Sequence, residues 1–251
     1  MTPAEPEKGA VIVTGASRGI GAAIAEKLAG DGYGVVVNYA ADTGGAESVV
    51  TTIRARGGRA VAVRADVADP GDVTDLFARA HRELGPLAAL VNNAGTLGAP
   101  ARVDEQEADA LTRLMLVNVV GPVLCAKHAV RAMSTAHGGA GGSIVNIASV
   151  AARTGGIPGS VPYAASKGAL VTFTRGLAAE VGAEGIRVNT VSPGVTATDM
   201  IAAVPEVREA AAGSPLGRVG RPDEIAAAVS WLISPASSFV TGSELTVSGG
   251  L

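Results

Sequence analysis

A chain of 251 residues is long enough to bury a sizeable core and fits one large α/β domain or two small ones. Its formal net charge of −3 predicts no nucleic-acid partner and no anionic membrane partner, because both require a basic face on the protein. The single cysteine, Cys125, cannot form an internal disulfide, which fits a reducing compartment.

The N-terminal residues 1–9 carry acids and prolines where a signal peptide would carry basic and then apolar residues. No uncharged apolar run approaches the roughly 20 residues that span a bilayer. We therefore expect a flexible N-terminus, a cytoplasmic protein and no membrane partner.

Short β-branched runs alternate with helical patterns along the chain. The runs span residues 10–15, 34–39, 60–66, 87–95, 142–149, 186–194 and 242–250. Between most of them, apolar residues recur at three- and four-residue spacing, for example over 20–32 and 71–85. Continuous apolar strands that alternate with helices indicate a parallel sheet covered on both faces. The sequence predicts one doubly wound α/β domain over residues 1–251, with about seven strands.

A glycine-rich turn, TGASRGIG (14–21), follows the first run and leads into a helix. Its glycines, Gly15, Gly19 and Gly21, allow a tight turn and a close approach of backbone to phosphate. The N-terminus of the helix adds free N–H groups and a favourable dipole. The turn predicts a dinucleotide site, and the alternative is a glycine-rich turn without a ligand.

The second run ends at Asn38, Tyr39 and Ala40, without the acid that usually binds the ribose of NAD. Asp42 comes slightly later and could reach back to that ribose. Arg18, within the glycine turn, suits a 2′-phosphate or stacking on adenine, although it could also be a solvated turn residue. This pattern favours NADP as the cofactor and leaves NAD possible.

Tyr163 and Lys167 stand four residues apart in the stretch PYAASKGAL (162–170), among small side chains. In a helix both side chains point into the same space, one turn apart. A cation beside a phenol lowers its pKa from about 10, which suits proton transfer to an alkoxide. Taken alone, such a pair is more often a packed ring beside a solvated amine.

Two further polar residues lie where this chemistry can use them. Ser149 follows a predicted strand and can hydrogen-bond a carbonyl oxygen, which stabilises the developing oxyanion. Asn118 lies in an apolar helix predicted over 114–126, where a polar side chain is out of place. It is either a satisfied core amide or a proton-relay and helix-shaping residue.

In order and spacing, these motifs resemble the short-chain dehydrogenase/reductase family. The resemblance rests on TGASRGIG (14–21), NNAG (92–95), Asn118, Ser149, YAASK (163–167) and SPG (192–194), and it extends from residue 10 to the C-terminus. It is closest to bacterial 3-oxoacyl-carrier-protein reductase-like and glucose-dehydrogenase-like members. The resemblance implies a Rossmann-type domain, often tetrameric, that moves hydride between a nicotinamide and a carbonyl or alcohol.

The resemblance also implies a role for each site residue. Tyr163 would be the acid/base, Lys167 its partner, Ser149 the carbonyl orienter and Asn118 the fourth catalytic member, acting as a relay. Asp66 would hydrogen-bond the adenine. The implied cofactor residues are Gly15, Ser17, Arg18, Gly19, Ile20, Gly21, Asn38, Tyr39, Ala40, Asp66, Val67, Asn93, Ala94, Gly95, Tyr163, Lys167, Pro193, Gly194, Thr196 and Thr198.

Two segments depart from the family pattern. The C-terminal turn reads VSGG, with Ser248 where the family commonly has aspartate, and this bears on the anchoring of the nearby loop. The turn GGAGG (138–142) is unusually rich in glycine and lies outside the site motifs.

Other chemistries find little support in the sequence. His81, His128 and His137 have no partner at metal-ligand spacing, so no metal site is predicted. Cys125 falls within an apolar helix and is predicted to be a small core residue. No G-x-S-x-G elbow accompanies Ser149, which argues against a hydrolase.

The first functional hypothesis is therefore an NADP-dependent carbonyl reductase or alcohol dehydrogenase. Its rivals are an NAD-dependent sugar or polyol dehydrogenase and a non-catalytic dinucleotide-binding sensor. Loops at 96–103, 151–161 and 195–220 are expected to form the pocket for a small-molecule substrate, with 195–220 as a mobile lid. Apolar helix faces, including that of 169–182, predict a homotetramer.

Overall fold

We describe a computed structural model of the chain over residues 8–198 and 214–251, with a seven-stranded sheet at its centre. Every strand pair is parallel, and the strand order is β3-β2-β1-β4-β5-β6-β7. The order reverses between β1 and β4, and sheets of this kind bind ligands at that switch point. The predicted doubly wound, Rossmann-type fold is confirmed.

The elements alternate along the chain as the sequence pattern indicates. The strands are β1 (Ala10–Val13), β2 (Gly34–Tyr39), β3 (Arg59–Arg64), β4 (Leu87–Asn92), β5 (Gly142–Ile147), β6 (Ile186–Pro193) and β7 (Glu244–Val247). The helices are α1 (Gly19–Gly30), α2 (Thr43–Ala55), α3 (Pro70–Leu84), α4 (Ala108–Met115), α5 (Gly121–Met133), α6 (Ala151–Thr154), α7 (Val161–Val181) and α10 (Pro222–Ile233). Short turns of helix complete the set, namely η1 (Val103–Glu105), η2 (Leu116–Val120), η3 (Thr135–His137), η4 (Gly182–Glu184) and η5 (Pro235–Ser237).

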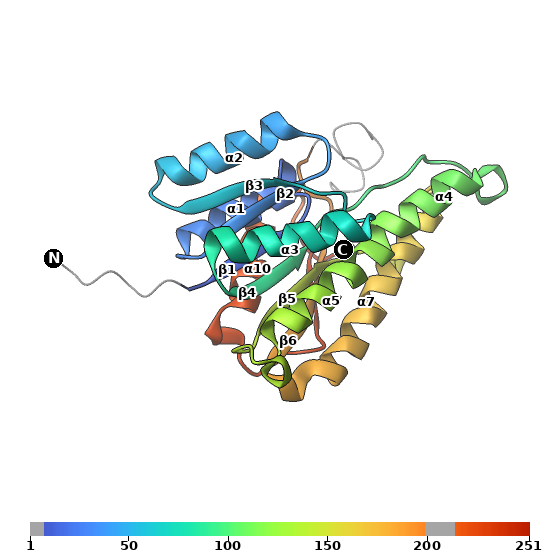
Figure 1. Cartoon of the computed structure of the whole chain (residues 1–251). Helices are drawn as coiled ribbons and strands as arrows, with labels where there is room; N and C mark the ends of the chain where they lie inside the picture. The colour runs from blue at the N-terminus through green and yellow to red at the C-terminus, as the bar shows by residue number, and fades with distance from the viewer. Residues whose placement is uncertain (1–7, 199–213) are drawn as a thin grey trace.

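Helices cover both faces of the sheet (Figure 1). On one face α1, α2 and α10 pack against the strands, with Leu28 and Leu232 fully buried. On the other face α3, α5 and α7 pack against them, with Leu76 and Met133 fully buried. Each such side chain contributes about 1.5–3 kcal/mol of hydrophobic stabilisation. Burial on both sides explains why the strands read as continuous apolar runs.

The sequence pattern located all of the strands but made several of them too long. The predicted run 34–39 coincides with β2, whereas 87–95 ends at Asn92 and 242–250 shortens to Glu244–Val247. The extra residues are small or polar and leave the strand ladder at its carboxyl end. Those residues shape the turns beside the cleft described below.

The helix predicted over 114–126 is part of a longer helical run, in which α4, η2 and α5 follow one another without a break. Its centre, η2, is a π-helical turn that contains Asn118. Turns of this kind occur frequently at functional sites.

By length and composition the same run, Ala108–Met133, could also cross a membrane, with a mean hydropathy of 1.4 over a stretch that is 33% buried. One such helix is a weak indication, since core helices pass the same test. In this fold the run packs against β4, α3 and α7.

Candidate active site

A cleft of about 990 Å³ opens at the carboxyl ends of β1 to β6. This volume is typical of a small-molecule or cofactor site. The lining includes every predicted cofactor residue, together with Ser149, Tyr163 and Lys167. Asn118 does not line the cleft and is completely buried beside it. The topology therefore brings residues from six strand ends to one place.

The turn between β1 and α1 has a shape that only glycine adopts readily. Gly15 and Gly19 have φ values of +62° and +58°, in the left-handed region. A Cβ on Gly15 would lie 2.8 Å from the Ala94 Cα, and one on Gly21 would lie 2.5 Å from the Asn93 Nδ2. No side-chain hydrogen bond caps the start of α1. Its backbone N–H groups and dipole therefore suit a bound phosphate, so the turn fits a dinucleotide diphosphate.

Asn38, at the end of β2, builds this turn with its side chain. Its Oδ1 accepts a hydrogen bond from the Gly15 N–H at 3.2 Å. Its Nδ2 donates to the carbonyl oxygens of Val63 at 3.2 Å and Ala65 at 3.0 Å. Asn38 is 1% exposed, and these bonds tie the turn after β1 to β3, so its amide is engaged by protein groups beneath the cleft surface.

Asp42, the acid that could have reached back to a ribose, caps α2 in this structure. Its Oδ1 accepts a hydrogen bond from the Gly45 N–H at 2.9 Å. The capping bond and the helix dipole hold the carboxylate at the N-terminus of α2. Arg18 lies at the N-cap position of α1 and lines the same end of the cleft.

Tyr163 and Lys167 lie one turn apart near the start of α7. The Lys167 Nζ is 5.8 Å from the centre of the Tyr163 ring and donates a hydrogen bond to the Ile147 carbonyl oxygen at 2.8 Å. That bond uses one of the three donor hydrogens of the ammonium. A hydrogen bond joins the Tyr163 phenol to Ser149, which follows β5. Three of the four predicted catalytic residues therefore meet at one wall of the cleft.

The pKa values of this pair differ from the prediction. Burial raises the pKa of the Tyr163 phenol, and the hydrogen bond with Ser149 opposes only part of that rise. Burial also lowers the pKa of Lys167 to about 8, because the ammonium is poorly solvated there. The predicted lowering of the tyrosine pKa by Lys167 is therefore wrong for this structure, in which burial sets the direction of the shift. The phenol is therefore protonated at neutral pH, as a phenol with the ordinary pKa of about 10 also is.

Asn118 connects the segment after β4 to α7. Its Oδ1 accepts from the Thr96 N–H at 2.8 Å, and its Nδ2 donates to the Thr96 carbonyl oxygen at 2.8 Å and to the Ser166 Oγ at 3.0 Å. Ser166 in turn donates to the Tyr163 carbonyl oxygen at 2.7 Å. The amide is thus satisfied by protein groups, as in the core-amide alternative, while it also supports the helix that carries the tyrosine. Its role as a relay stays a prediction.

Arg113 of α4 also lines the cleft, and sequence reasoning missed it. It pairs with Asp66 over a separation of 47 residues, with 2.7 Å between Nη2 and Oδ2. Partial burial raises the pKa of Asp66, but the Ala68 N–H and Arg113 outweigh burial and hold it below the usual value. No periodic pattern in the sequence points to such a contact.

Of the three predicted loops, 96–103 and the start of 195–220 line the cleft among the described residues, and 151–161 packs behind the first of them. Leu97, Gly98 and Pro100 line the cleft, and the Ala101 N–H donates to the Gly159 carbonyl oxygen at 3.1 Å. This bond joins the loop at 96–103 to the loop at 151–161.

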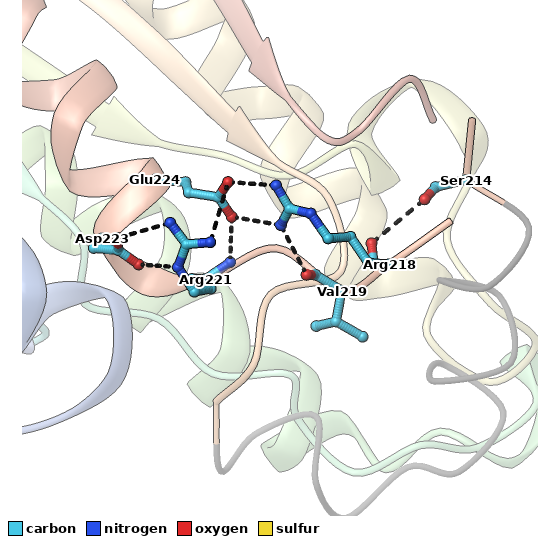
Figure 2. Close-up of polar contacts among 6 residues, drawn as sticks. All are labelled: Ser214, Arg218, Val219, Arg221, Asp223 and Glu224. Atoms are coloured by element: carbon cyan, nitrogen blue, oxygen red, sulfur yellow. Dashed lines mark hydrogen bonds and ion pairs between the residues drawn. The ribbon is translucent and has the colours of Figure 1, made fainter. Parts of the chain in front are cut away.

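Most of the predicted lid over 195–220, including Pro205, lies outside the described residues, but both of its ends are described. Thr196 and Gly220 form an isolated parallel bridge. Beyond it, Arg218 pairs with Glu224 at the start of α10, with 2.6 Å between Nη2 and Oε1 (Figure 2). The Arg221 N–H also donates to Glu224, at 2.7 Å. These contacts fix the C-terminal end of the segment to α10.

Ser248, the departure in the C-terminal turn, packs against the segment after β6. A Cβ on Gly194 would lie 2.7 Å from the Ser248 Cα, and the Gly194 N–H donates to the Val247 carbonyl oxygen at 2.9 Å. The anchoring that the family motif suggests is therefore present with serine at this position.

A phosphate cradle at one end of the cleft and a proton-transfer group at the other place the protein among the dinucleotide-dependent oxidoreductases. The family model described as "Enoyl-(Acyl carrier protein) reductase" matches residues 15–251. An uncharacterised oxidoreductase of Escherichia coli, YgfF, is 44% identical over 242 residues, 95% of this chain and 98% of the relative. A cis-4-hydroxycyclohexanecarboxylate dehydrogenase of Sinomonas cyclohexanicum is 43% identical over 241 residues, 95% of this chain and 94% of the relative.

Solved structures agree with these matches. A blue fluorescent protein from a metagenomic library, in complex with NADPH, has a TM-score of 0.90 at 40% identity, over 97% of this chain and 98% of its own. A 7α-hydroxysteroid dehydrogenase in complex with NADH and 7-oxo glycochenodeoxycholic acid has a TM-score of 0.90 at 34% identity, over 97% and 94%. The chain belongs to the short-chain dehydrogenase/reductase family.

Proposed function

We propose that this protein transfers hydride between NADP(H) and a small-molecule carbonyl or secondary alcohol, an activity of class EC 1.1.1. The observation that carries the proposal is the meeting of Ser149, Tyr163 and Lys167 at one wall of the cleft whose other end is the glycine turn. A sensor without catalysis has no need for all three groups at one wall of the cleft.

When bound, the cofactor supplies or accepts the hydride. Ser149 then orients the substrate carbonyl by a hydrogen bond, and Tyr163 donates the proton that the alkoxide requires. Tyr163 carries that proton at neutral pH, since its pKa lies above the ordinary value of a phenol. Lys167 supports the phenol electrostatically and has two further donors for ribose hydroxyls. Asn118 holds Thr96 and α7 in place, and we keep the relay role for it.

The preference for NADP over NAD rests on the end of β2. Asp42 is oriented toward the N-terminus of α2 by its capping bond, so the acid nearest this end serves a helix cap. Arg18 lines the same end and supplies a planar cation that suits a 2′-phosphate. Among the similar structures, one is a complex with NADPH and another a complex with NADH, so a direct comparison on this protein is required.

We also propose that the protein is a cytoplasmic homotetramer. Apolar side chains that stay exposed on α5 and at the end of α10 support the assembly, and the prediction is argued below.

Tyr163→Phe tests the proposed chemistry because it removes only the hydroxyl. We expect turnover on a panel of ketones and 3-oxoacyl thioesters to fall at least about a hundredfold, the usual contribution of a general acid. NADPH affinity, measured by fluorescence titration, should stay within about twofold because the ring is retained. Near-normal turnover with intact NADPH binding would show that Tyr163 is not the acid.

A further inference from the structure

Arg113 reaches from α4 across the cleft to the end of β3, although half of its side chain is exposed to solvent. Its guanidinium pairs with the Asp66 carboxylate, with 2.7 Å between Nη2 and Oδ2. The other carboxylate oxygen, Oδ1, accepts from the Ala68 N–H at 3.0 Å. Both partners line the cleft at the end where the glycine turn lies. The pair is therefore part of a cleft wall, unlike an ordinary surface ion pair.

The contacts around Asp66 leave it able to bind a further donor. Each carboxylate oxygen has about two lone-pair positions, and each holds one hydrogen bond from the protein here. The Asp66 N–H itself donates to the Asp72 Oδ2 at 2.8 Å, so the backbone on both sides of the carboxylate is held as well. The carboxylate is oriented in advance and can accept one more hydrogen bond on its cleft side.

The helix that carries Arg113 is attached to this segment at a second point. A Cβ on Gly121 would lie 2.8 Å from the Val67 Cγ2 and 3.0 Å from the Val67 carbonyl oxygen, so α5 presses directly on the residue after Asp66. Asn118, between the two attachments, supports Thr96 beside the catalytic wall. One helical run thus connects the Asp66 end of the cleft to the Tyr163 end.

We propose that Arg113 is a cofactor-positioning residue, which orients the Asp66 carboxylate to accept a hydrogen bond from the adenine amino group of the cofactor. This inference rests on the proposed function and on the role that the family resemblance implies for Asp66, the binding of adenine. Arg113 adds two things to that function. It fixes the direction of the carboxylate, and it neutralises a negative charge that would otherwise repel a polyanionic cofactor.

The test compares NADPH with reduced nicotinamide hypoxanthine dinucleotide phosphate, which carries a carbonyl oxygen in place of the adenine amino group. A carbonyl oxygen cannot donate to Asp66, so the ratio of the two dissociation constants reports this hydrogen bond. The variant is Arg113→Gln. The matched control is Arg102→Gln, since Arg102 pairs with Asp104 at 2.8 Å on the surface and lies outside the cleft. Asp66→Ala supplies the ratio expected without the carboxylate.

Fluorescence titration should give the starting protein a ratio of about tenfold or more, the effect typical of a hydrogen bond to a charged group. Arg102→Gln should keep that ratio, and Arg113→Gln should lower it to within about twofold of the Asp66→Ala value. Thermal unfolding of each variant shows whether it is folded. If Arg113→Gln is not folded, Arg113→Lys, which keeps the charge, replaces it.

Two results would overturn the inference, and only the first of them would also contradict the adenine role of Asp66. If the starting protein binds both cofactors equally, the adenine role that the resemblance implies for Asp66 is wrong and the inference is wrong with it, while the proposed hydride transfer is untouched. If the starting protein prefers NADPH over the hypoxanthine analogue and Arg113→Gln shows the same preference, Asp66 binds adenine without any contribution from Arg113. Arg113 would then have no part in orienting the carboxylate, and weaker binding of both cofactors by the variant would reflect only the lost positive charge.

Discussion

The buried position of Lys167 costs folding stability, and a role in the site explains why the lysine is there. The side chain is 4% exposed, and its ammonium has one protein hydrogen bond, to the Ile147 carbonyl oxygen. A buried ammonium with few partners is costly, and burial lowers the pKa of Lys167 to about 8. Such a group is expected where chemistry or a ligand requires it.

The pKa of Lys167 predicts how stability changes with pH. Between about pH 8 and 10.5 the unfolded chain binds a proton at this lysine that the folded chain has lost, so the free energy of unfolding rises with pH. The rise amounts to about 3 kcal/mol. In Lys167→Met it should be absent, and Lys127→Met, at an exposed lysine of α5, controls for the loss of a lysine. Denaturant unfolding at several pH values measures the difference, and parallel curves for the starting protein and Lys167→Met would refute the prediction.

Arg18 is the residue on which the cofactor preference depends. We expect NADPH to bind more tightly than NADH, by about tenfold or more, because a guanidinium pairs strongly with a 2′-phosphate. Arg18→Ala should weaken NADPH binding and leave NADH binding nearly unchanged, so the difference in affinity between the two cofactors becomes smaller. Equal affinities of the starting protein for NADPH and NADH, measured by titration, would contradict the proposal and favour an NAD-dependent enzyme.

A buried polar network fastens α7 to the sheet. The Thr174 Oγ1 accepts from the Asn146 Nδ2 at 2.8 Å and from the Thr190 Oγ1 at 2.7 Å, so one hydroxyl joins α7 to both β5 and β6. Asn146 also accepts from the Asn92 Nδ2 on β4, at 2.9 Å. Since Thr174 lies two turns beyond Lys167 on α7, the network fixes the position of Tyr163 and Lys167 relative to the carboxyl ends of the strands.

Thr174→Val should reveal how much this network contributes. The substitution keeps the shape and leaves the buried donors of Asn146 and Thr190 without an acceptor, so we expect a loss of about 2–4 kcal/mol of unfolding free energy. Thr51→Val is the control, since the Thr51 hydroxyl donates to a carbonyl oxygen of its own helix at an exposed position. A loss below about 0.5 kcal/mol, the usual range for a surface substitution, would show that the network is dispensable.

At the scale of the whole molecule, several large apolar side chains remain exposed among the described residues, on the run from α4 to α5 and near the C-terminus among other places. Val123 on α5 is 41% exposed and lies on the run that packs beside α7 (Figure 1). Trp231 on α10 is 40% exposed, and Phe239, after η5, is fully exposed. Exposed apolar patches of this kind usually mark interfaces, and two patches on one subunit are what a tetramer with two-fold axes requires.

Light scattering at micromolar concentration should therefore give about four times the chain mass of 24.7 kDa. Val123→Glu places a charge in the first patch and should reduce the mass to about half, because the second patch still pairs two subunits. A monomeric starting protein would contradict the proposed tetramer. An unchanged tetramer in Val123→Glu would show that Val123 does not lie in a subunit interface.

The sequence by itself determined the fold class, the strand order along the chain, the glycine turn and the candidate site residues. These features depend on local patterns, such as a periodicity, a turn that needs glycine, or two residues one helical turn apart. Strand ends were less certain, because the small polar residues that leave the ladder look like its continuation.

Only the tertiary structure decided what several of those residues do. It placed the Asn38 amide under the glycine turn, made Asp42 a helix cap and paired Arg113 with Asp66 across 47 residues. It also raised the pKa of Tyr163, although a neighbouring lysine alone would lower it. The physical reason is common to all four. Hydrogen-bond partners distant along the chain and the degree of burial are set when the strands and helices pack together, and no local pattern records them.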